Sequence, residues 1–539
     1  MNKKRTIVEG FSSLVLYNIS IYKYVWGVSP NTKKLRRRTM KKRFLALILA
    51  ALMCASLLVA CGSDKKPAAT TSGGNNNPTE TDPTIVKVND YVSALAAEHK
   101  LDGATFTYVG GGGQHAEDEE ETGNIENDAL YFRQRDLEDM LGIDWEGFKA
   151  AYAEGEGNGG HAVVDYVKNA VMAGTKVYDL VYGTLVVTTQ PLFNENCLES
   201  VSDFSVTNLD NEWWPATLQE THSIGGKMFF LTGPIMTTYY GDGQALLFNK
   251  AVAEDYGIEA PYESVLDGTW TFDKMFEIAN AIPLNTSGTG EYRYGDPHGL
   301  SIMYAHGMTI TKFDDAGVPY VEPTLPSELV DLCDKFSVIM GDESQAAHCK
   351  YSGSTWEEVS DKYGYENFSE MFADGKFLFY FAPTDEAAGL REKDVEFGIL
   401  PIPKGSADQD QYYCYADNWA GRFCAVPKCT RDIATTDVVL EAMAALSLKH
   451  IKPAYYDKLL KGRSTHDTDS REMLDIIFKS KIYDIVDIYS LGNASASGTF
   501  VRDLEKSIAF DSSSLSSAYL VGEKMAKNQI KKIMAMVNR

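Results

Sequence analysis

Residues 227–250 read KMFFLTGPIMTTYYGDGQALLFNK and contain two short apolar runs, 228–231 and 245–248, each of strand length. Between the runs lie Gly233-Pro234 and Gly241-Asp242-Gly243, which are typical of turns. The segment therefore predicts a bend between two strands. The TTYY sequence inside the bend, residues 237–240, combines hydroxyl groups with aromatic rings, as in side chains that orient a ligand in a cleft. An ordinary β-meander with a tyrosine pair in its core fits the same residues.

The chain before this bend has the pattern of a parallel sheet. Residues 104–109 predict a buried strand, 127–141 a helix, 163–173 a second helix with valine at helical spacing, and 177–182 another buried strand. Strands and helices that alternate with short links predict a parallel sheet covered by helices. Because ligands bind beyond the carboxyl ends of such strands, the residues that follow them are candidate site residues.

The glycine-rich turn after the first strand has a second interpretation. Residues 111–116 fit the loose Gly-x-Gly-x-x-Ala pattern of a dinucleotide-binding loop. The next residues, 117–121, are all acidic and would repel a pyrophosphate. The sequence therefore favours a glycine turn followed by a solvated acidic loop, and it leaves adventitious calcium as a minor alternative.

The chain after the bend alternates helices and strands. Helices are predicted at 249–258, from Thr271 as N-cap onward, and at 368–376. A strand at 377–382 ends in Pro383-Thr384-Asp385, and a further strand is predicted at 395–403. Residues 434–460 and 471–489 predict C-terminal helices.

The N-terminal region predicts export and lipid anchoring. A basic segment at 41–43 precedes an uncharged run at 44–60 and then Cys61, which is the order of a secretory signal that starts at Met40. The sequence LVAC at 58–61 resembles a bacterial lipobox, in which the cysteine is lipidated and becomes the first residue. We expect an upstream extension at 1–39, a lipoprotein signal peptide at 40–60 and a flexible polar tether at 61–84. An uncut membrane helix is the alternative.

Charge and cysteine usage exclude several function classes. Residues 1–60 hold 12 of the 51 basic and one of the 75 acidic residues, so 39 basic and 74 acidic residues remain after them, a net charge of −35. Nucleic acid and anionic membrane surfaces are therefore poor partners. Six cysteines follow the anchor without a metal-binding spacing, and their pairing is left open. These are Cys197, Cys333, Cys349, Cys414, Cys424 and Cys429.

Six motifs, in this order along the chain, resemble the extracellular solute-binding proteins of family 1, the receptors of ABC importers that include maltodextrin-binding proteins. They are YDLVY at 178–182, LLFNK at 246–250, GTWT at 268–271, FADGK at 372–376, FGILP at 397–401 and AVPK at 425–428. The resemblance covers residues 85–539. The long segments 194–226 and 285–365 depart from the family pattern, so the resemblance defines the ligand class less well than the fold.

The resemblance implies an α/β, two-lobe, periplasmic-binding-protein-like fold of type II, with lobes joined by crossing hinge strands. Lobe 1 would comprise 85–237 plus 380–418, and lobe 2 would comprise 238–379 plus 419–539. The crossings would lie near 235–239, 379–383 and 418–421. Hinge closure would then bury a ligand at the lobe interface.

The implied function is a lipid-anchored receptor that captures a small polar solute, preferentially a carbohydrate, and delivers it to an ABC permease. We expect a monomer outside the cytoplasm, held to the cell membrane by lipid (palmitate) on Cys61, with no cofactor, no metal and no nucleic acid. Sugars need aromatic faces and polar partners for their hydroxyl groups. By position, the candidate ligand-binding residues are Gln114, His115, Tyr182, Tyr239, Tyr240, Asp242, Thr384, Asp385, Asn418 and Trp419.

Two other function classes fit the same composition. A lipid-anchored glycoside hydrolase needs only a pair of carboxylates, and acidic residues are abundant. However, the sequence contains no Gly-x-Ser-x-Gly, His-Glu-x-x-His or Walker motif, so we expect a protein that is not an enzyme. A sensor or adhesin with the same two-lobe shell is the third class. Turnover of oligosaccharides would identify a glycoside hydrolase. A missing permease partner would identify a sensor or adhesin.

Overall fold

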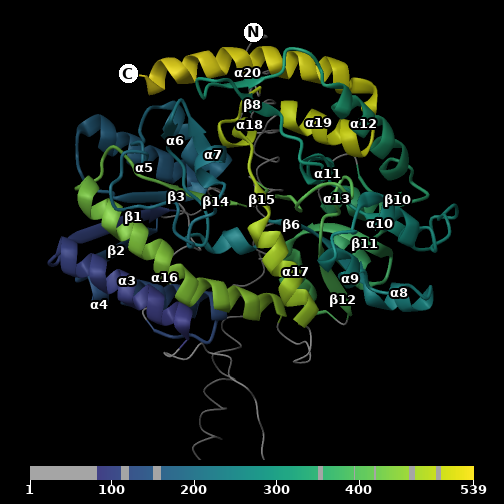
Figure 1. Ribbon diagram of the computed structural model, residues 1–539, viewed down its shortest axis with the longest axis horizontal. Helices are drawn as coiled ribbons and strands as arrows, with labels where there is room; N and C mark the ends of the chain where they lie inside the picture. Colours follow the sequence, from purple (N-terminus) through teal and green to yellow (C-terminus); the bar gives the residue numbers. More distant parts are fainter. Residues whose placement is uncertain are drawn as a thin grey trace, which may run out of the picture. The chain divides into compact units, whose positions relative to one another are not determined.

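The computed structural model describes residues 82–110, 120–149, 159–349, 356–393, 395–417, 421–460, 468–492 and 499–538 (Figure 1). The predicted signal peptide, Cys61 and the predicted tether up to residue 81 lie outside the described residues. Within these ranges, no helix is long and apolar enough to cross a membrane. Two main sheets organise the described chain, and we call each sheet with its helices a lobe.

The sheet of the first lobe has the strand order β14-β3-β1-β2. Strands β1, β2 and β3 are parallel, whereas β14 pairs antiparallel with β3, and Cys424 lies opposite Tyr182. Its strands are β1 (Thr105–Gly110), β2 (Asp144–Lys149), β3 (Leu180–Thr184) and β14 (Arg422–Ala425). Its helices and short hairpin are α3 (Pro83–His99), α4 (Ile125–Leu141), α5 (Gly159–Ala173), η1 (Leu185–Thr189), α6 (Gln190–Asn194), α7 (Leu218–His222), β4 (Ser223–Ile224) and β5 (Lys227–Met228).

The sheet of the second lobe has the order β10-β7-β11-β6-β12. Its strands are β6 (Gln244–Asn249), β7 (Tyr292–Gly295), β10 (Ala346–Ala347), β11 (Phe377–Pro383) and β12 (Phe397–Pro401). The helices between them are α8 (Lys250–Asp255), α9 (Tyr262–Leu266), α10 (Phe272–Ala279), α11 (Gly299–Ala305), α12 (Ser327–Met340), α13 (Trp356–Tyr363), α14 (Phe368–Ala373) and α15 (Thr384–Leu390). Shorter strands and later helices are β8 (Thr311–Phe313), β9 (Pro319–Val321), β13 (Cys414–Tyr415), β15 (Lys481–Ile482), α17 (Thr468–Lys479), α18 (Ile485–Ile488), α19 (Thr499–Ala509) and η3 (Ser512–Ser514).

Two chain segments cross between the lobes side by side. The first is η2 (Thr237–Tyr240) with residues 241–243, which leads from the first lobe into β6. The second, residues 414–417, leads from the second lobe toward β14. Gly243 forms an antiparallel bridge with Ala416, and the Asp417 amide donates to the Asp242 carbonyl at 3.0 Å. The crossing predicted near 235–239 overlaps η2, and most of the one predicted near 418–421 falls outside the described residues.

The strand pairing departs from the predicted division of the chain in two places. Strand β11 lies wholly within the second sheet, so no crossing occurs near 379–383, and β12 pairs with β6 rather than joining the first lobe. Conversely, β14 lies in the first sheet, although residues from 419 onward were expected in the second lobe. The resemblance implied a crossing near 379–383, but Pro383 ends β11 and α15 begins directly after it in the same lobe.

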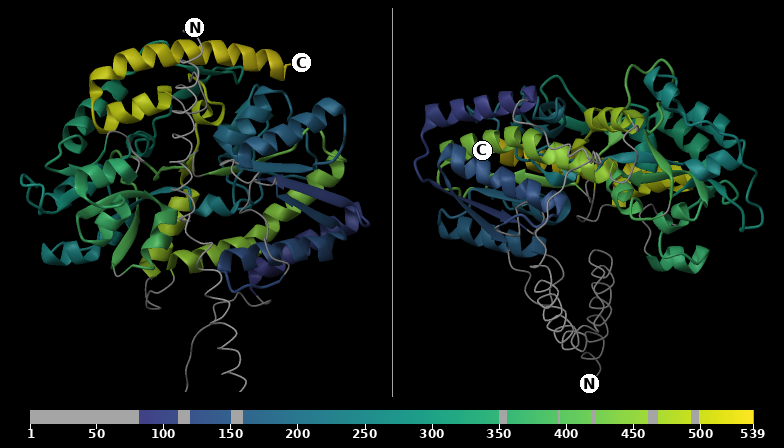
Figure 2. Two further views of the ribbon diagram at one scale, coloured as in Figure 1. Left: turned by 180° about the vertical axis from the view of Figure 1, so that it is seen from behind. Right: turned by 90° about the horizontal axis from the view of Figure 1, so that it is seen from below.

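Two long helices belong to both lobes. Helix α16 (Ile433–Leu460) packs against α3 and α4 of the first lobe and also contacts α15 and α17, and it contains Pro453 (Figure 1). Helix α20 (Leu515–Val537) packs on α19 and β9, while the Met534 side chain near its end reaches Gly225 of the first lobe (Figure 2). Helices α16 and α20 therefore each contact both lobes.

Segment 194–226, which departs from the family pattern, is fastened to α16 by two buried carboxylates. Asp437 accepts hydrogen bonds from the amides of residues 205–207 at 2.7 to 2.9 Å. Glu441 accepts from the indole N–H groups of Trp213 and Trp214 at 2.9 and 2.8 Å. Because each buried carboxylate is satisfied by several donors, the segment is an integral part of the first lobe.

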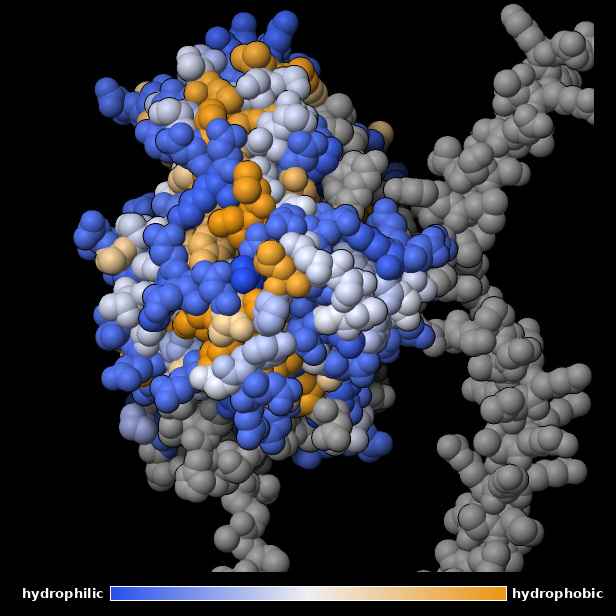
Figure 3. Space-filling model, turned by 90° about the vertical axis from the view of Figure 1, so that its right-hand side faces the viewer, coloured by the Kyte–Doolittle hydropathy of each residue, from blue (hydrophilic) through white to orange (hydrophobic). Residues whose placement is uncertain are grey.

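The face shown in Figure 3 is hydrophilic for the most part. Figure 3 views the molecule from the side of the second lobe and shows hydrophobic residues in narrow bands between hydrophilic ones. Inside, Cys197, Cys333, Cys414, Cys424 and Cys429 are buried free thiols. Burial raises the pKa of the Cys333, Cys414 and Cys424 thiols to about 12, so these cysteines are packing residues rather than reactive groups.

Candidate functional site

A cavity of about 1010 Å³ lies where the lobes meet. Its walls come from the start of α4, from the first crossing segment, from the end of β11 with α15, and from the end of α16. The volume is at the upper end of the range typical of small-molecule sites. The lining residues are Gly123, Asn124, Ile125, Glu126, Thr238, Gly241, Asp242, Pro383, Asp385, Glu386, Ala388, Gly389, Arg391, Glu392, Tyr455 and Lys458.

Helix caps position the acidic groups of this cavity. Asn124 caps α4, because its side chain accepts hydrogen bonds from the amides of Glu126 and Asn127, both at 3.1 Å. This places Glu126 in the first helical turn, at the cavity wall. On the other side, the Asp385 amide donates to the Gly241 carbonyl at 3.1 Å, which fastens the start of α15 to the crossing segment.

Lys458 forms the central charged contact. Its ammonium lies 3.3 Å from a Glu126 oxygen and 3.1 Å from an Asp385 oxygen, and the Tyr455 hydroxyl donates to the same Asp385 oxygen at 2.8 Å. Burial lowers the pKa of Lys458, but Asp385 and Glu126 outweigh burial and raise the pKa above its ordinary value. Lys458 is therefore a cation at neutral pH that links carboxylates from both lobes.

A buried ion pair forms the floor of the cavity. Asp242 on the crossing segment pairs with Lys481 of β15, which also donates to the Tyr239 carbonyl. Burial raises the pKa of the Asp242 carboxyl to about 6, although the charge of Lys481 opposes the rise. A Cβ atom at Gly421 would lie 2.8 Å from a carboxylate oxygen of Asp242, so glycine is needed there. The ion pair therefore joins the first crossing segment to β15, and Gly421 lies against the same carboxylate.

The remaining charged groups make the cavity acidic. Burial raises the pKa of Glu386, with Asp385 adding to the rise and Ser369 opposing it. The Arg391 guanidinium stacks over the Phe397 ring at 3.9 Å and donates to the Leu459 carbonyl, so it is held in place. Five carboxyl groups and two cations are found among the described lining residues. Such a wall suits ligands rich in hydroxyl groups, which both donate and accept hydrogen bonds.

The structure brings only part of the predicted site to this cavity. Asp242 and Asp385 line it. Tyr182 is 1% exposed and stacks on Tyr108 with ring centroids 4.4 Å apart, inside the first lobe. Gln114, His115, Asn418 and Trp419 lie outside the described residues.

The other predicted residues belong to the packing beneath the cavity. Tyr239 donates to the Phe478 carbonyl at 3.1 Å, and Tyr240 packs edge-on against Phe478 at 5.1 Å. Thr384 is fully buried, and its hydroxyl donates to the Tyr240 carbonyl at 2.7 Å. Tyr239 and Tyr240 are therefore core residues, as expected for the alternative in which an ordinary β-meander buries the tyrosine pair.

Sequence reasoning missed Glu126, Arg391, Tyr455 and Lys458 as lining residues. Tyr455 and Lys458 lie on the helix predicted at 434–460, but nothing in a helical pattern says which turn faces a cavity. Glu126 comes just before the helix predicted at 127–141, and no helix was predicted around Arg391. Lys458 is more than three hundred residues from Glu126 along the chain, so only the fold brings them together.

Comparison with solved structures defines the class of fold. A cyclo/maltodextrin-binding protein complexed with maltotetraose matches with a TM-score of 0.50 and 14% identity, over 80% of this chain and 98% of that chain. Apo RafE from Streptococcus pneumoniae matches with a TM-score of 0.48 and 14% identity, over 80% and 98%. An ABC substrate-binding protein from Listeria monocytogenes in complex with cycloalternan gives 0.45 and 12%, over 81% and 100%.

The chain has the two-lobe fold of the solute-binding proteins, as the resemblance predicted. No family model matches the sequence, and no curated protein matches it. The described residues contain no cluster of His, Cys, Asp and Glu that is suited to a metal ion.

Proposed function

We propose that the protein is a solute-binding receptor of an ABC importer and that the cavity between the lobes takes a neutral carbohydrate. The observation that carries this proposal is the Lys458 contact, which joins carboxylates of both lobes across a cavity of suitable size. The fold is that of a protein solved with maltotetraose, which supports a carbohydrate over other polar solutes. Closure of the lobes would bury the ligand, and the ligand would favour closure by its higher affinity for the closed form.

The remaining parts of the proposal rest on sequence. Lipid on Cys61 would hold the receptor to the outer side of the cell membrane, and a permease would accept the solute. Asp242, Asp385, Glu126, Tyr455 and Lys458 are the proposed ligand-binding residues within the described chain. Gln114, His115, Asn418 and Trp419 remain proposed members of the site.

A calorimetric titration with a panel of neutral oligosaccharides tests the proposal, and each mixture is analysed for cleaved products. We expect saturable binding of at least one sugar, a higher melting temperature in its presence, and no product. Binding followed by release of shorter sugars would replace the receptor with a glycoside hydrolase. No binding of any sugar, together with binding of a peptide, would change the ligand class.

A further inference from the structure

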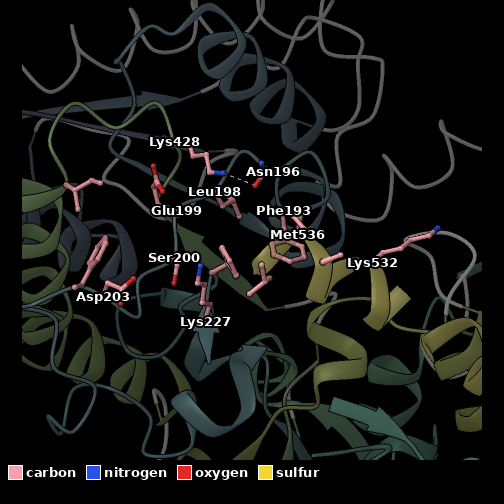
Figure 4. A pocket seen from close by; sticks show the side chains of 15 residues that line it. Phe193, Asn196, Leu198, Glu199, Ser200, Asp203, Lys227, Lys428, Lys532 and Met536 are labelled. Atoms are coloured by element: carbon pink, nitrogen blue, oxygen red, sulfur yellow. Dashed lines mark hydrogen bonds between the residues drawn. The ribbon is translucent and has the colours of Figure 1, made fainter. Parts of the chain in front are cut away.

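A second cavity lies away from the interlobe site, between the first lobe and the end of α20 (Figure 4). Its volume is about 840 Å³, which is also in the range of small-molecule sites. We call it the α20 pocket. Its lining residues are Phe193, Asn196, Leu198, Glu199, Ser200, Asp203, Phe204, Lys227, Phe229, Lys428, Ile433, Lys532, Ala535, Met536 and Val537.

The α20 pocket has an apolar part with rigid walls. Phe193 and Phe229 pack against each other with ring centroids 5.0 Å apart, and both belong to the hydrophobic core. Met536 of α20 closes this side, and α20 is itself fixed by its packing on α19 and β9. Ile433, another lining residue, is 45% exposed, although it is apolar. An apolar ligand body would cover these groups.

The charged groups of the pocket are three lysines and two carboxylates, so cations outnumber anions there in a chain with a formal net charge of −24. Lys428 is held by a hydrogen bond to the Asn196 side chain at 2.7 Å. Lys227 forms no side-chain hydrogen bond or ion pair within the described part of the chain. In Figure 4, Lys227 lies between the carboxylate side of the pocket, with Glu199 and Asp203, and the apolar side, with Phe193 and Met536.

We propose that the α20 pocket binds a small organic anion with an apolar body, such as a medium-chain carboxylate. The anionic group would lie at Lys227 and Lys428, and the apolar body would extend over Phe193 toward Met536. Glu199 and Asp203 lie on the side of the pocket away from Phe193 and Met536, and they would repel the anionic group from that side because like charges repel. This site is independent of the sugar site, since none of its lining residues lines the cavity between the lobes.

The test is isothermal titration calorimetry of the full chain in detergent-free buffer with hexanoate, hexan-1-ol, hexylammonium and acetate. Hexanoate should bind with a dissociation constant on the order of 1 mM, because six carbons and one charge supply limited affinity. Hexan-1-ol should bind about tenfold more weakly, since it keeps the apolar body and lacks the charge. Hexylammonium and acetate should show no saturable binding. Equal binding of hexanoate and hexan-1-ol, or no binding of hexanoate, overturns the proposal.

Variants locate the site. Lys227→Met should weaken hexanoate binding about tenfold, and Lys227→Arg, which keeps the charge, should retain most of it. Lys531→Met is the matched control, because Lys531 lies on α20 but does not line the pocket. Melting temperatures of all variants show whether they fold. A folded Lys227→Met protein that binds hexanoate as tightly as the unsubstituted chain would overturn the proposal.

Discussion

The Lys458 ammonium at the end of α16 lies 3.3 Å from the Glu126 carboxylate at the start of α4. Both residues line the cavity between the lobes. Asp385 is within 3.1 Å of the same ammonium, so one cation faces carboxylates of both lobes. Lys458 therefore links a carboxylate of the first lobe with a carboxylate of the second.

Replacement of Lys458 by methionine keeps the length of the side chain and removes its charge. We expect about a tenfold loss of affinity for the sugar identified by titration, because a charge-assisted hydrogen bond is lost. Lys452→Met is the control, since Lys452 lies on the same helix and does not line the cavity. Calorimetric titration measures both. Equal affinity in the Lys458→Met and unsubstituted proteins would remove Lys458 from the proposed site.

Gly241 allows the crossing segment to pass close to α16. A Cβ atom there would lie 2.2 Å from the Tyr455 hydroxyl and 3.2 Å from Asp385 Cβ. Its φ of −103° suits any residue, so Gly241→Ala acts by steric clash alone. We expect a loss of about 1 to 3 kcal/mol in the free energy of unfolding and weaker sugar binding.

Gly389→Ala is the matched control for stability, because a Cβ atom at Gly389 in α15 meets nothing within 4 Å. It should raise the free energy of unfolding by about 0.5 to 1 kcal/mol, since glycine is unfavourable within a helix. Urea unfolding of both variants measures the difference. Similar effects of the two substitutions would contradict the proposed clash.

Lys481→Met removes the partner of a buried carboxylate. The side chains of Lys481 and Asp242 are 1% and 2% exposed, so the remaining charge could not reach water. We expect a loss of about 3 to 5 kcal/mol in the free energy of unfolding. The double variant with Asp242→Leu should recover much of this loss, because no charge is then buried. Failure of the second substitution to recover stability would show that the ion pair is not the cause.

His222 makes the free energy of unfolding fall as the solution becomes acidic. Burial lowers the pKa of His222 to about 3, so the folded protein holds the neutral ring. The unfolded chain has an ordinary histidine pKa of about 6.5 and binds a proton first as the pH falls. The stabilising contribution is thus present above pH 6.5 and is lost at about 1.4 kcal/mol per pH unit below it.

The experiment compares the unsubstituted protein with His222→Phe, which keeps an aromatic ring between Phe423 and Tyr483. The difference in free energy of unfolding should be constant above pH 7.5 and should shift in favour of the variant below pH 6.5. Urea unfolding at a series of pH values measures it. A difference that does not change with pH would mean that the ring is already accessible to protons.

The sequence predicted several local elements correctly, whereas the single helix expected at 471–489 is wrong, because this stretch holds the end of α17, β15 and α18. The helix expected to end at Gly142 does so with Gly142 in the left-handed conformation, and Thr271 caps α10 through its side chain. These signals are local, because a cap or a glycine stop acts on its own turn of helix. The strand expected at 377–382 is β11, but its sheet partners depend on distant segments, and the predicted crossing there was wrong.

The candidate site was harder to predict for a physical reason. An aromatic or polar residue at the end of a strand suits a ligand site and a packed interface equally well. Tyr239 and Tyr240 turned inward to join the core of the second lobe, whereas Asp242 remained at the cavity floor, where Lys481 compensates its charge. That compensation comes from a strand more than two hundred residues away, which no pattern of neighbouring residues reveals.

Helix α16 has a mechanical consequence for the two lobes. One uninterrupted helix is built into both hydrophobic cores, so a rotation of one lobe against the other must bend it. Pro453 has no amide hydrogen to donate to the Lys449 carbonyl, which leaves the helix most compliant at that turn. If the lobes open as proposed, the elastic response of this helix, set by a single missing hydrogen bond, would limit how far and how easily they separate.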